Sequence, residues 1–389
     1  MPYNKKPQRS GRMFKNEVAE FIYKRTYSRW IEEEARREDW PETIERFIGF
    51  IISERPDIPE KTIHKIRKYM TEFAVMPSMR FLWAAGPAAK ADNTTIYNCS
   101  FAKINCVDAF AECLYILMCG TGFGFSVEDE EISKLPVIPE IKSGQALAKV
   151  LIEDSKKGWA DSVKTLMNSL YDGQNIYFDY SAIRPEGARL MTMGGRASGP
   201  APLIKLHDFI RETLHNAQGR QLTTLECHDI CNQIAEIVVV GGVRRSSQIS
   251  LSDLQDNDMR HAKDWPFPIK RAMANNSAIY REKPSAADFL KEWGSLALSG
   301  SGERGIFNLE AAQSRAPSRR YSPKIEGTNP CGEIMLRDMQ FCNLSEVVVR
   351  EDDDLDTLLD KVECATWLGV IQSSFTDFPY LRETWKKNC

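Results

Sequence analysis

The feature that most constrains the fold is a change of sequence texture at Met76-Pro77. Beyond it, short apolar runs alternate with amphipathic stretches and glycine-rich turns. The runs are FGFSV after Gly122, IYFDY at Ile176–Tyr180, AEIVVVGG ending at Gly242, and SQISLSD at Ser247–Asp253. Strands that alternate with helices are typical of an α/β architecture with parallel strand pairing. We therefore expect an α/β fold for residues 76–389.

The segment before this boundary has the periodicity of helices. From about Asn16 to Phe73, apolar and aromatic residues recur at spacings of three and four, with charged residues between them. A further helical stretch, PEKTIHKIRKYMTEF, begins at Pro59. We therefore expect a helical amino-terminal region, residues 1–75, ahead of the α/β part.

Composition excludes some classes of function. The chain has 51 Lys and Arg against 54 Asp and Glu, and this balance argues against a nucleic-acid-binding protein. No apolar run reaches the roughly 18 residues of a membrane span, and the basic start lacks the apolar segment of a secretory signal. We expect a cytoplasmic protein whose ten cysteines are mostly reduced, so that any disulfide is catalytic rather than structural.

The most informative segment is TNPCGEIMLRDMQFCNLSEV. Asn329, Cys331 and Glu333 are spaced by two, so in an extended segment an amide, a thiol and a carboxylate project to one side. Pro330 and Gly332 between them favour a loop tip over a strand interior. This combination indicates chemistry rather than packing.

A second thiol, Cys342, follows Cys331 after the apolar run resumes. This second thiol argues against the plainer interpretation, in which the segment is a turn that happens to contain a thiol. A zinc site would need paired C-x-x-C spacings, and none occurs in the sequence, so we expect no metal site.

N-P-C-G-E followed by F-C-N-L-S-E resembles the ribonucleotide reductases, most closely the adenosylcobalamin-dependent (class II) ribonucleoside-triphosphate reductases. The further matching motifs, in family order, are YKRTYSRW, REDWPET, YNCSF, GTGFGFSVE, IRPEGARL, ASGPAP, VVVGGVRRSSQISLSD, ANNS and GERGIFN. The resemblance extends from about Glu17 to the last residue. It implies the amino-terminal part of a ten-stranded α/β barrel with a finger loop, preceded by a helical extension.

The resemblance also implies catalytic roles. Cys331 matches the finger-loop cysteine that becomes a thiyl radical and abstracts the 3'-hydrogen of the ribose. Glu333 matches the general base on the 3'-hydroxyl, a role that suits a partly buried carboxylate, and Asn329 matches the amide that orients the sugar hydroxyls. Cys99 and Cys342 match the pair that supplies two electrons and becomes a disulfide, so their Cα atoms should lie within about 7 Å.

The same family pattern suggests a substrate-binding set. Ser78 and Asn98 occupy positions where the family has small polar groups near the substrate. Gly120, Gly122 and Gly124 match a loop whose lack of side chains lets backbone approach the bound nucleotide. The glycines alone are a weak signal, because they lack the full G-x-G-x-x-G pattern and precede a strand.

Two loops match the family's effector, or specificity, loops. Arginine suits both, because its planar guanidinium pairs with phosphate or with a base edge. The residues concerned are Arg184 and Arg189 in one loop, and Gly241, Gly242, Arg244 and Arg245 in the other. The effector site would lie at a dimer interface, or within one chain if residues 140–220 replace the partner.

The resemblance implies adenosylcobalamin as cofactor, a ribonucleoside tri- or diphosphate as substrate, a deoxynucleoside triphosphate as effector and a thioredoxin-like reductant. The family's barrel needs a second half, and the sequence stops at TWKKNC. We therefore expect a downstream half as a further partner and no activity from this chain alone. Cys389 would then mark a splice junction or a truncation. Two alternatives stay open: a reductase whose radical comes from a separate metal-containing subunit, and an inert fragment.

Overall fold

The computed structural model describes residues 13–142, 149–190, 196–238, 246–318 and 325–389. The chain forms two compact units. The first comprises Met1–Ala91 and Leu344–Phe375, and the second comprises Asp92–Asn343 and Thr376–Cys389. Among the described residues, no helix is both long and apolar enough to cross a membrane.

The first unit is mainly helical. Its elements are α1 (Glu17–Thr26), β1 (Trp30–Ile31), β2 (Arg36–Arg37), α2 (Trp40–Glu54), α3 (Glu60–Thr71), β3 (Val75–Pro77), α4 (Met79–Ala84), α5 (Pro87–Ala91), β14 (Ser345–Val347) and α14 (Leu355–Ser373). Helix α2 begins with a capping box, in which Asp39 accepts from the Glu42 N–H and Glu42 accepts from the Asp39 N–H. Its buried residues recur at helical spacing, as the periodicity predicts.

The late segment Leu344–Phe375 completes this first unit. Strand β14 pairs antiparallel with β3, with Glu346 opposite Met76. Helix α14 joins α3 through the ion pair between Lys65 Nζ and Asp360 Oδ1, at 2.6 Å. The helical region therefore contains residues from two distant parts of the sequence.

The second unit is built on a six-stranded sheet in the order β10-β9-β8-β5-β4-β13. Its strands are β4 (Cys99–Lys103), β5 (Gly122–Ser126), β8 (Gln248–Asp253), β9 (Ala274–Tyr280), β10 (Gly305–Asn308) and β13 (Gln340–Cys342). The first five in sequence are parallel, whereas β13 runs antiparallel to β4. The expected α/β fold with parallel pairing is confirmed, and within the described residues the sheet is open at β10 and β13.

The remaining elements of this unit are helices and short pieces. They are η1 (Asn93–Ile96), α6 (Val107–Met118), α7 (Asp129–Ile132), β6 (Val150–Leu151), α8 (Lys156–Tyr171), β7 (Phe178–Asp179), α9 (Ala201–Asn216), α10 (Thr224–Val238), α11 (Asn257–Arg260), η2 (Ile269–Met273), α12 (Ala286–Ser299), α13 (Leu309–Arg315), β11 (Gly327–Thr328), β12 (Met335–Leu336) and α15 (Glu383–Asn388). The run AEIVVVGG was expected to be a strand, and this is wrong for its first residues. Residues 235–238 end helix α10, because burial of that helix overrides the β-propensity of the β-branched run.

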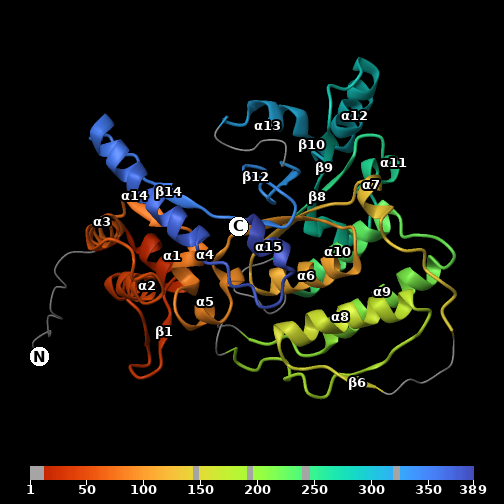
Figure 1. Cartoon of the computed structure of the whole chain (residues 1–389), viewed down its shortest axis with the longest axis horizontal. Coiled ribbons are helices and arrows are strands. Elements are labelled where there is room, and N and C mark those ends of the chain that lie inside the picture. Colours follow the sequence, from red (N-terminus) through yellow and green to blue (C-terminus); the bar gives the residue numbers. More distant parts are fainter. Residues whose placement is uncertain (1–12, 143–148, 191–195, 239–245, 319–324) are drawn as a thin grey trace, which may run out of the picture. The chain divides into compact units, whose positions relative to one another are not determined.

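Different elements pack on the two faces of the six-stranded sheet (Figure 1). Side chains alternate along each strand, so Cys99 and Phe101 of β4 share one face with Ile249 of β8. That face packs against the β11–β12 hairpin and α13. Phe125 points to the other face, where it approaches the His228 ring of α10 at 6.1 Å. Helices α6 and α10 lie on this second face, with α8 and α9 beyond them.

Candidate active site

The segment N-P-C-G-E forms the turn of a very short hairpin. Strands β11 and β12 pair antiparallel through only two residue pairs. The Asn329 N–H donates to the Ile334 carbonyl at 3.2 Å, and the Ile334 N–H donates to Asn329 Oδ1 at 3.0 Å. The Gly332 N–H donates to the Asn329 carbonyl, with φ at +86° for Gly332, a conformation that favours glycine. The loop tip expected from the sequence is therefore closed by its own hydrogen bonds.

The tip exposes a thiol and a carboxylate but buries the amide. Cys331 and Glu333 are exposed, whereas Asn329 is 0% exposed. Asn329 Oδ1 is used inside the loop, and its Nδ2 has no hydrogen-bond partner in the described protein. The three side chains therefore do not share one environment, and the partial burial that suits a general base is absent at Glu333. The buried Nδ2 remains a donor for a group from outside the chain.

The sheet brings Cys99 and Cys342 together. Strands β13 and β4 pair antiparallel with Cys342 directly opposite Cys99. Directly opposed residues in such a pair have Cα atoms about 4.5–5.5 Å apart, which lies within the range that a disulfide spans. Both cysteines are 2% exposed, and neither is in a disulfide. The hydrogen bond from the Cys99 side chain, together with burial, raises the pKa of Cys342 well above its ordinary value.

The hairpin lies over this thiol pair. A Cβ on Gly122 of β5 would come within 3.2 Å of Pro330 Cγ and 3.3 Å of Cys99 Sγ. The ring of Pro330 and the sulfur of Cys99 therefore both border the space next to Gly122. The charge of Glu333 is also close enough to contribute to the raised pKa of Cys342. The exposed thiol of the tip and the buried pair thus belong to one site.

Glycines make room for the hairpin. A Cβ on Gly124 would overlap the Thr328 carbonyl oxygen, and a Cβ on Gly327 would overlap the Phe101 ring. The close approach that the sequence assigned to a nucleotide at Gly122 and Gly124 is made here by the chain's own hairpin. Gly120 has a different role, because with φ at +81° its N–H donates to the Leu117 carbonyl and closes helix α6.

The other two expected substrate contacts take part in local structure. Ser78 is in the first unit, where its Oγ caps α4 by accepting from the Phe81 N–H at 3.1 Å and from Gln372 Nε2 at 3.2 Å. Asn98 is half-buried in the second unit, and its carbonyl accepts from the Gly122 N–H at 2.8 Å.

The expected effector loops are described only in part. Arg184 Nε forms an ion pair with Asp154 Oδ2 at 2.6 Å. Arg189 forms an isolated antiparallel bridge with Arg196. Four further expected residues lie outside the described part of the chain, namely Gly241, Gly242, Arg244 and Arg245.

Residues that support the hairpin were missed from the sequence. Thr328 donates through Oγ1 to the Ile334 carbonyl at 3.1 Å, and its own carbonyl lies on Gly124. Phe341, next to Cys342, stacks on Tyr97 with ring centroids 4.9 Å apart. The aromatic residues that flank both cysteines, in YNCSF and MQFCN, were the only sequence signal for this support.

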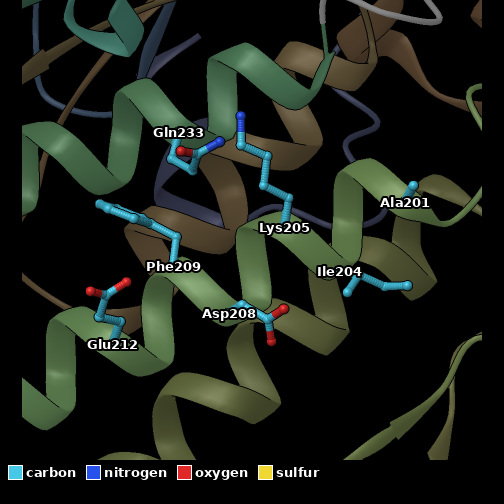
Figure 2. Close-up of a pocket in the computed structure, with 7 residues that line it drawn as sticks. All are labelled: Ala201, Ile204, Lys205, Asp208, Phe209, Glu212 and Gln233. Carbon is cyan, nitrogen blue, oxygen red and sulfur yellow. The ribbon is translucent and has the colours of Figure 1, made fainter. Parts of the chain in front are cut away.

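A pocket of about 470 Å³ lies away from the thiols (Figure 2). It is lined by Ala201, Ile204, Lys205, Asp208, Phe209 and Glu212 of α9 and by Gln233 of α10. Lys205 Nζ is paired with Glu236 at 2.9 Å, and Lys270 Nζ lies 3.6 Å from the centre of the Phe209 ring. Within the described residues, no group of three or more His, Cys, Asp or Glu is arranged to hold a metal ion.

Family models match two parts of the chain. The ribonucleotide reductase alpha domain matches residues 3–87, and the insertion domain of B12-dependent ribonucleotide reductase matches residues 140–214. The second match covers α8 and most of α9, together with the loop that carries Arg184 and Arg189.

Curated relatives carry one name. The chain is 30% identical to the adenosylcobalamin-dependent ribonucleoside-triphosphate reductase of Lactobacillus gasseri, over 85% of this chain and 54% of the relative. It is 28% identical to the enzyme of that name from Lactobacillus leichmannii, over 94% of this chain and 59% of the relative. The chain therefore spans little more than half the length of the curated relatives it matches.

Solved structures agree with this family. A B12-dependent (class II) ribonucleotide reductase crystal structure matches with a TM-score of 0.77 and 25% identity, covering 92% of this chain and 59% of the other. The class Id alpha subunit from Actinobacillus ureae matches with a TM-score of 0.53 and 13% identity, covering 94% of this chain and 56% of that subunit, which shows a likeness of fold alone. These matches show that the chain is similar, over most of its length, to the B12-dependent ribonucleotide reductases.

Proposed function

We propose that this chain carries the thiol machinery of an enzyme that reduces ribonucleotides to 2'-deoxyribonucleotides. The substrate would be a ribonucleoside tri- or diphosphate. The observation that carries the proposal is the register that sets Cys342 opposite Cys99, beneath a hairpin whose tip exposes Cys331. Two thiols that can share a disulfide, with a third thiol above them, fit a reaction that needs one radical and two electrons.

The reaction distributes its steps over these residues. Cys331, as a thiyl radical, takes the 3'-hydrogen atom of the ribose. Glu333, which is exposed in the chain alone and which the bound nucleotide would have to cover, accepts the proton of the 3'-hydroxyl. The 2'-hydroxyl then leaves as water. Cys99 and Cys342 give up two electrons and two protons and become a disulfide, and Cys331 returns its hydrogen atom to C3'. The net change is one ribonucleotide and two thiols converted to one deoxyribonucleotide, one disulfide and one water.

The unpartnered amide of Asn329 supports a sugar ligand at this place. Its Nδ2 is buried and has no acceptor within the described protein, although such donors normally find one. A ribose hydroxyl that accepts from this Nδ2 would satisfy the donor and be held beside the tip. Because Oδ1 is fixed by the Ile334 N–H, the direction of the Nδ2 donor is fixed as well.

Adenosylcobalamin is the radical source we propose, since the named relatives depend on it. When bound, it would supply the radical that converts the Cys331 thiol to a thiyl. The tip fits such a group, because Cys331 is exposed and a Cβ on Gly332 would meet nothing within 4 Å. The part that this chain plays is to present that sulfur on a fixed hairpin and to hold the reducing pair out of water.

Three partners belong to the same proposal. A thioredoxin-like reductant would return the Cys99–Cys342 disulfide to thiols. A deoxynucleoside triphosphate would bind at the loop of Arg184 and Arg189 and at the loop of Gly241, Gly242, Arg244 and Arg245. This is supported by the insertion-domain match at residues 140–214, in which Arg184 would exchange Asp154 for a phosphate. A polypeptide equivalent to the rest of the relatives would complete the barrel beyond the open sheet edges.

The division of the chain and its location complete the proposal. Along the sequence, residues 1–75 would form the helical region and residues 76–389 the first part of the barrel, with residues 76–91 and 344–375 of that part packed in the first unit. The enzyme would work in the cytoplasm, where a thioredoxin-like reductant keeps thiols reduced.

The test combines this chain with adenosylcobalamin, a ribonucleoside triphosphate and a second polypeptide. The second polypeptide is equivalent to the part of the relatives that this chain does not cover. Two readouts are needed: deoxynucleotide formed, and tritium released from a 3'-labelled substrate. We expect Cys331→Ala to abolish both. Cys342→Ala should abolish deoxynucleotide formation but keep some tritium release, because its role follows hydrogen abstraction.

The matched control is Cys227→Ala, a buried thiol of α10 with no place in the mechanism. It should keep both readouts near those of the parent chain. Tritium release that survives in Cys331→Ala, or equal loss of both readouts in Cys342→Ala, would contradict the assigned roles.

A further inference from the structure

Three residues lie at one end of the three segments that carry the sulfurs. Lys103 ends strand β4, which begins at Cys99. Glu326 immediately precedes β11, on the way to the tip thiol. Asp338 lies between β12 and β13, and β13 ends at Cys342. Each sulfur-bearing segment therefore contributes one charged residue.

These three residues bond to one another in a closed ring. Lys103 Nζ donates to Glu326 Oε1 at 2.5 Å. The Asp338 N–H donates to Glu326 Oε2 at 2.9 Å, and the Lys103 N–H donates to Asp338 Oδ1 at 2.8 Å. Both carboxylate oxygens of Glu326 are used, one by a side chain and one by backbone. Each residue is thus tied to the other two, and the ring fixes backbone as well as side chains.

We propose that Lys103, Glu326 and Asp338, here called the clamp, are positioning residues that set the register of the thiol hairpin on the thiol pair. This inference rests on the proposed function, which assigns the catalytic roles of Cys331, Cys99 and Cys342. The clamp touches neither the sulfurs nor the sugar site. It acts by holding the two ends of the hairpin and the start of β13 against the end of β4.

The hairpin needs such a restraint. It has only two residue pairs, and a short two-stranded hairpin is marginal by itself. The turn after it includes Met339 with φ at +51°, a left-handed conformation that a non-glycine residue adopts only when its surroundings enforce it. Asp338, next to Met339, is held by the clamp on one side, and its carbonyl accepts from Asn388 Nδ2 at 2.8 Å. The clamp therefore supports the turn between the two catalytic segments.

The clamp is better shielded than an ordinary surface ion pair. The Lys103 side chain is 14% exposed and that of Glu326 is 34% exposed, and Lys103 Nζ also lies 3.2 Å from the buried Glu131. Burial acts to lower the pKa of Lys103, but Glu326 and Glu131 together raise it, so the ammonium stays charged. Burial and the Glu326 charge raise the pKa of Asp338. Exposed pairs contribute little, whereas shielded and hydrogen-bonded ones fix geometry.

The test uses the 389-residue chain and reads which sulfurs pair. The chain is incubated with oxidised glutathione, remaining thiols are alkylated, and disulfide-linked peptides are identified by mass spectrometry. Two protein thiols and one glutathione disulfide give one protein disulfide and two glutathione thiols. In the parent chain we expect the Cys99–Cys342 disulfide, with Cys331 left as a thiol or a glutathione adduct.

Lys103→Met and Glu326→Gln should let the hairpin shift. We expect disulfides of Cys331 with Cys99 or Cys342 to rise by about tenfold, the ratio expected for loss of one hydrogen bond to a charged group. Asp338→Ala should behave in the same way. Asp338→Asn should resemble the parent chain, because its amide oxygen can still accept from the Lys103 N–H.

The matched control is Lys134→Met. Lys134 Nζ bonds to Glu131 Oε2 at 2.7 Å but does not contact the clamp, and its side chain is 48% exposed. It should leave the pairing unchanged. The clamp is rejected if Lys103→Met and Glu326→Gln fold and pair as the parent does, or if Lys134→Met shifts the pairing equally. If Lys103→Met fails to fold, the disulfide pairing in Glu326→Gln tests the clamp, because the Glu326 side chain is more exposed and its substitution is better tolerated. The pairing is read without turnover, so failure here is distinct from failure of the proposed reduction.

Discussion

Two buried thiol pairs lie on opposite faces of the same sheet. Cys99 and Cys342 lie on the hairpin face, opposite each other on neighbouring strands. Cys113 of α6 and Cys231 of α10 lie on the helical face, where a hydrogen bond joins their side chains and both are 0% exposed. Burial raises the pKa of Cys231 well above its ordinary value, and the Cys113 side chain adds to this. The two pairs are therefore similar in burial, and each contains one thiol, Cys342 or Cys231, whose pKa is raised.

What differs is their surroundings. Strand register forces Cys99 and Cys342 into a distance that a disulfide spans, and an exposed third thiol lies above them. The helical pair is fixed by packing, with Gln248 Nε2 at 3.5 Å from Cys113 Sγ and 3.2 Å from the Cys231 carbonyl. Burial therefore does not distinguish the two pairs. Under the proposed function, strand register and access through the tip make Cys99 and Cys342 the redox pair, and each of these two features can be tested.

The largest expected effect comes from closing the space beneath the hairpin. In Gly124→Ala the new Cβ would overlap the Thr328 carbonyl, which is backbone and cannot rotate away. We expect a loss of about 3 kcal/mol in the free energy of unfolding, at the upper end of overpacking costs. The loss is measured by urea denaturation. A folded variant should also show faster alkylation of Cys342, because the hairpin no longer covers the pair. Unchanged stability and alkylation would contradict the packing described for the hairpin face.

Acid should lower the free energy of unfolding through His228, which is buried on the helical face. His228 of α10 is fully buried, and burial, followed by the charges of Lys263, Arg271 and Lys270, lowers its pKa to about 3. Its folded pKa lies below its unfolded value near 6.5, so the stability it contributes is present above that value and is lost as the pH falls. Between pH 7 and pH 5 we expect a loss of about 2 kcal/mol from this group.

His228→Gln should flatten that part of the pH dependence, which denaturant titrations at several pH values would reveal. Glu333→Gln serves as a control on the hairpin face, since Glu333 is exposed at the tip. An equal slope in His228→Gln and the parent chain would show that the histidine does not carry the effect.

Sequence predicted the components of the hairpin face better than their arrangement. The spacing in N-P-C-G-E and its proline and glycine indicated a loop tip, and the family pattern named Cys99 and Cys342 as partners. The direct register between them depends on long-range strand pairing, which no local pattern encodes. The roles of Gly122 and Gly124 depend on the segment that lies over them, so a glycine pattern alone predicts close approach without its partner.

The fold shows the same limit. Alternating helices and apolar runs indicated parallel α/β structure, which the sheet confirms. The short apolar run AEIVVVGG predicts a strand, yet its first residues, 235–238, end α10. The joining of Leu344–Phe375 to the amino-terminal unit also has no local signal, because it rests on the pairing of β14 with β3. Long-range pairing is the information that periodicity lacks.

The third prediction contrasts the two thiol pairs directly. With oxidised glutathione, the Cys99–Cys342 disulfide should form about tenfold faster than a Cys113–Cys231 disulfide, because exchange needs an accessible thiol. Peptide mapping over time gives both rates. Cys331→Ser should slow formation of the Cys99–Cys342 disulfide. The exposed Cys331 thiol would first form a mixed disulfide with glutathione, releasing one glutathione thiol, and this mixed disulfide would then exchange with the buried pair. Equal rates for the two pairs would mean that register and access do not separate them.

The smallest expected effect serves as the control for the first. Gly294 lies inside α12, and a Cβ there would meet nothing within 4 Å. Alanine favours a helix interior over glycine by up to about 1 kcal/mol, so Gly294→Ala should stabilise the chain slightly or leave it unchanged. The same substitution should therefore have opposite signs at Gly124 and Gly294, measured by the same urea denaturation. If Gly294→Ala destabilised the chain as much as Gly124→Ala, the cost at Gly124 would reflect a general intolerance of added volume rather than the hairpin above it.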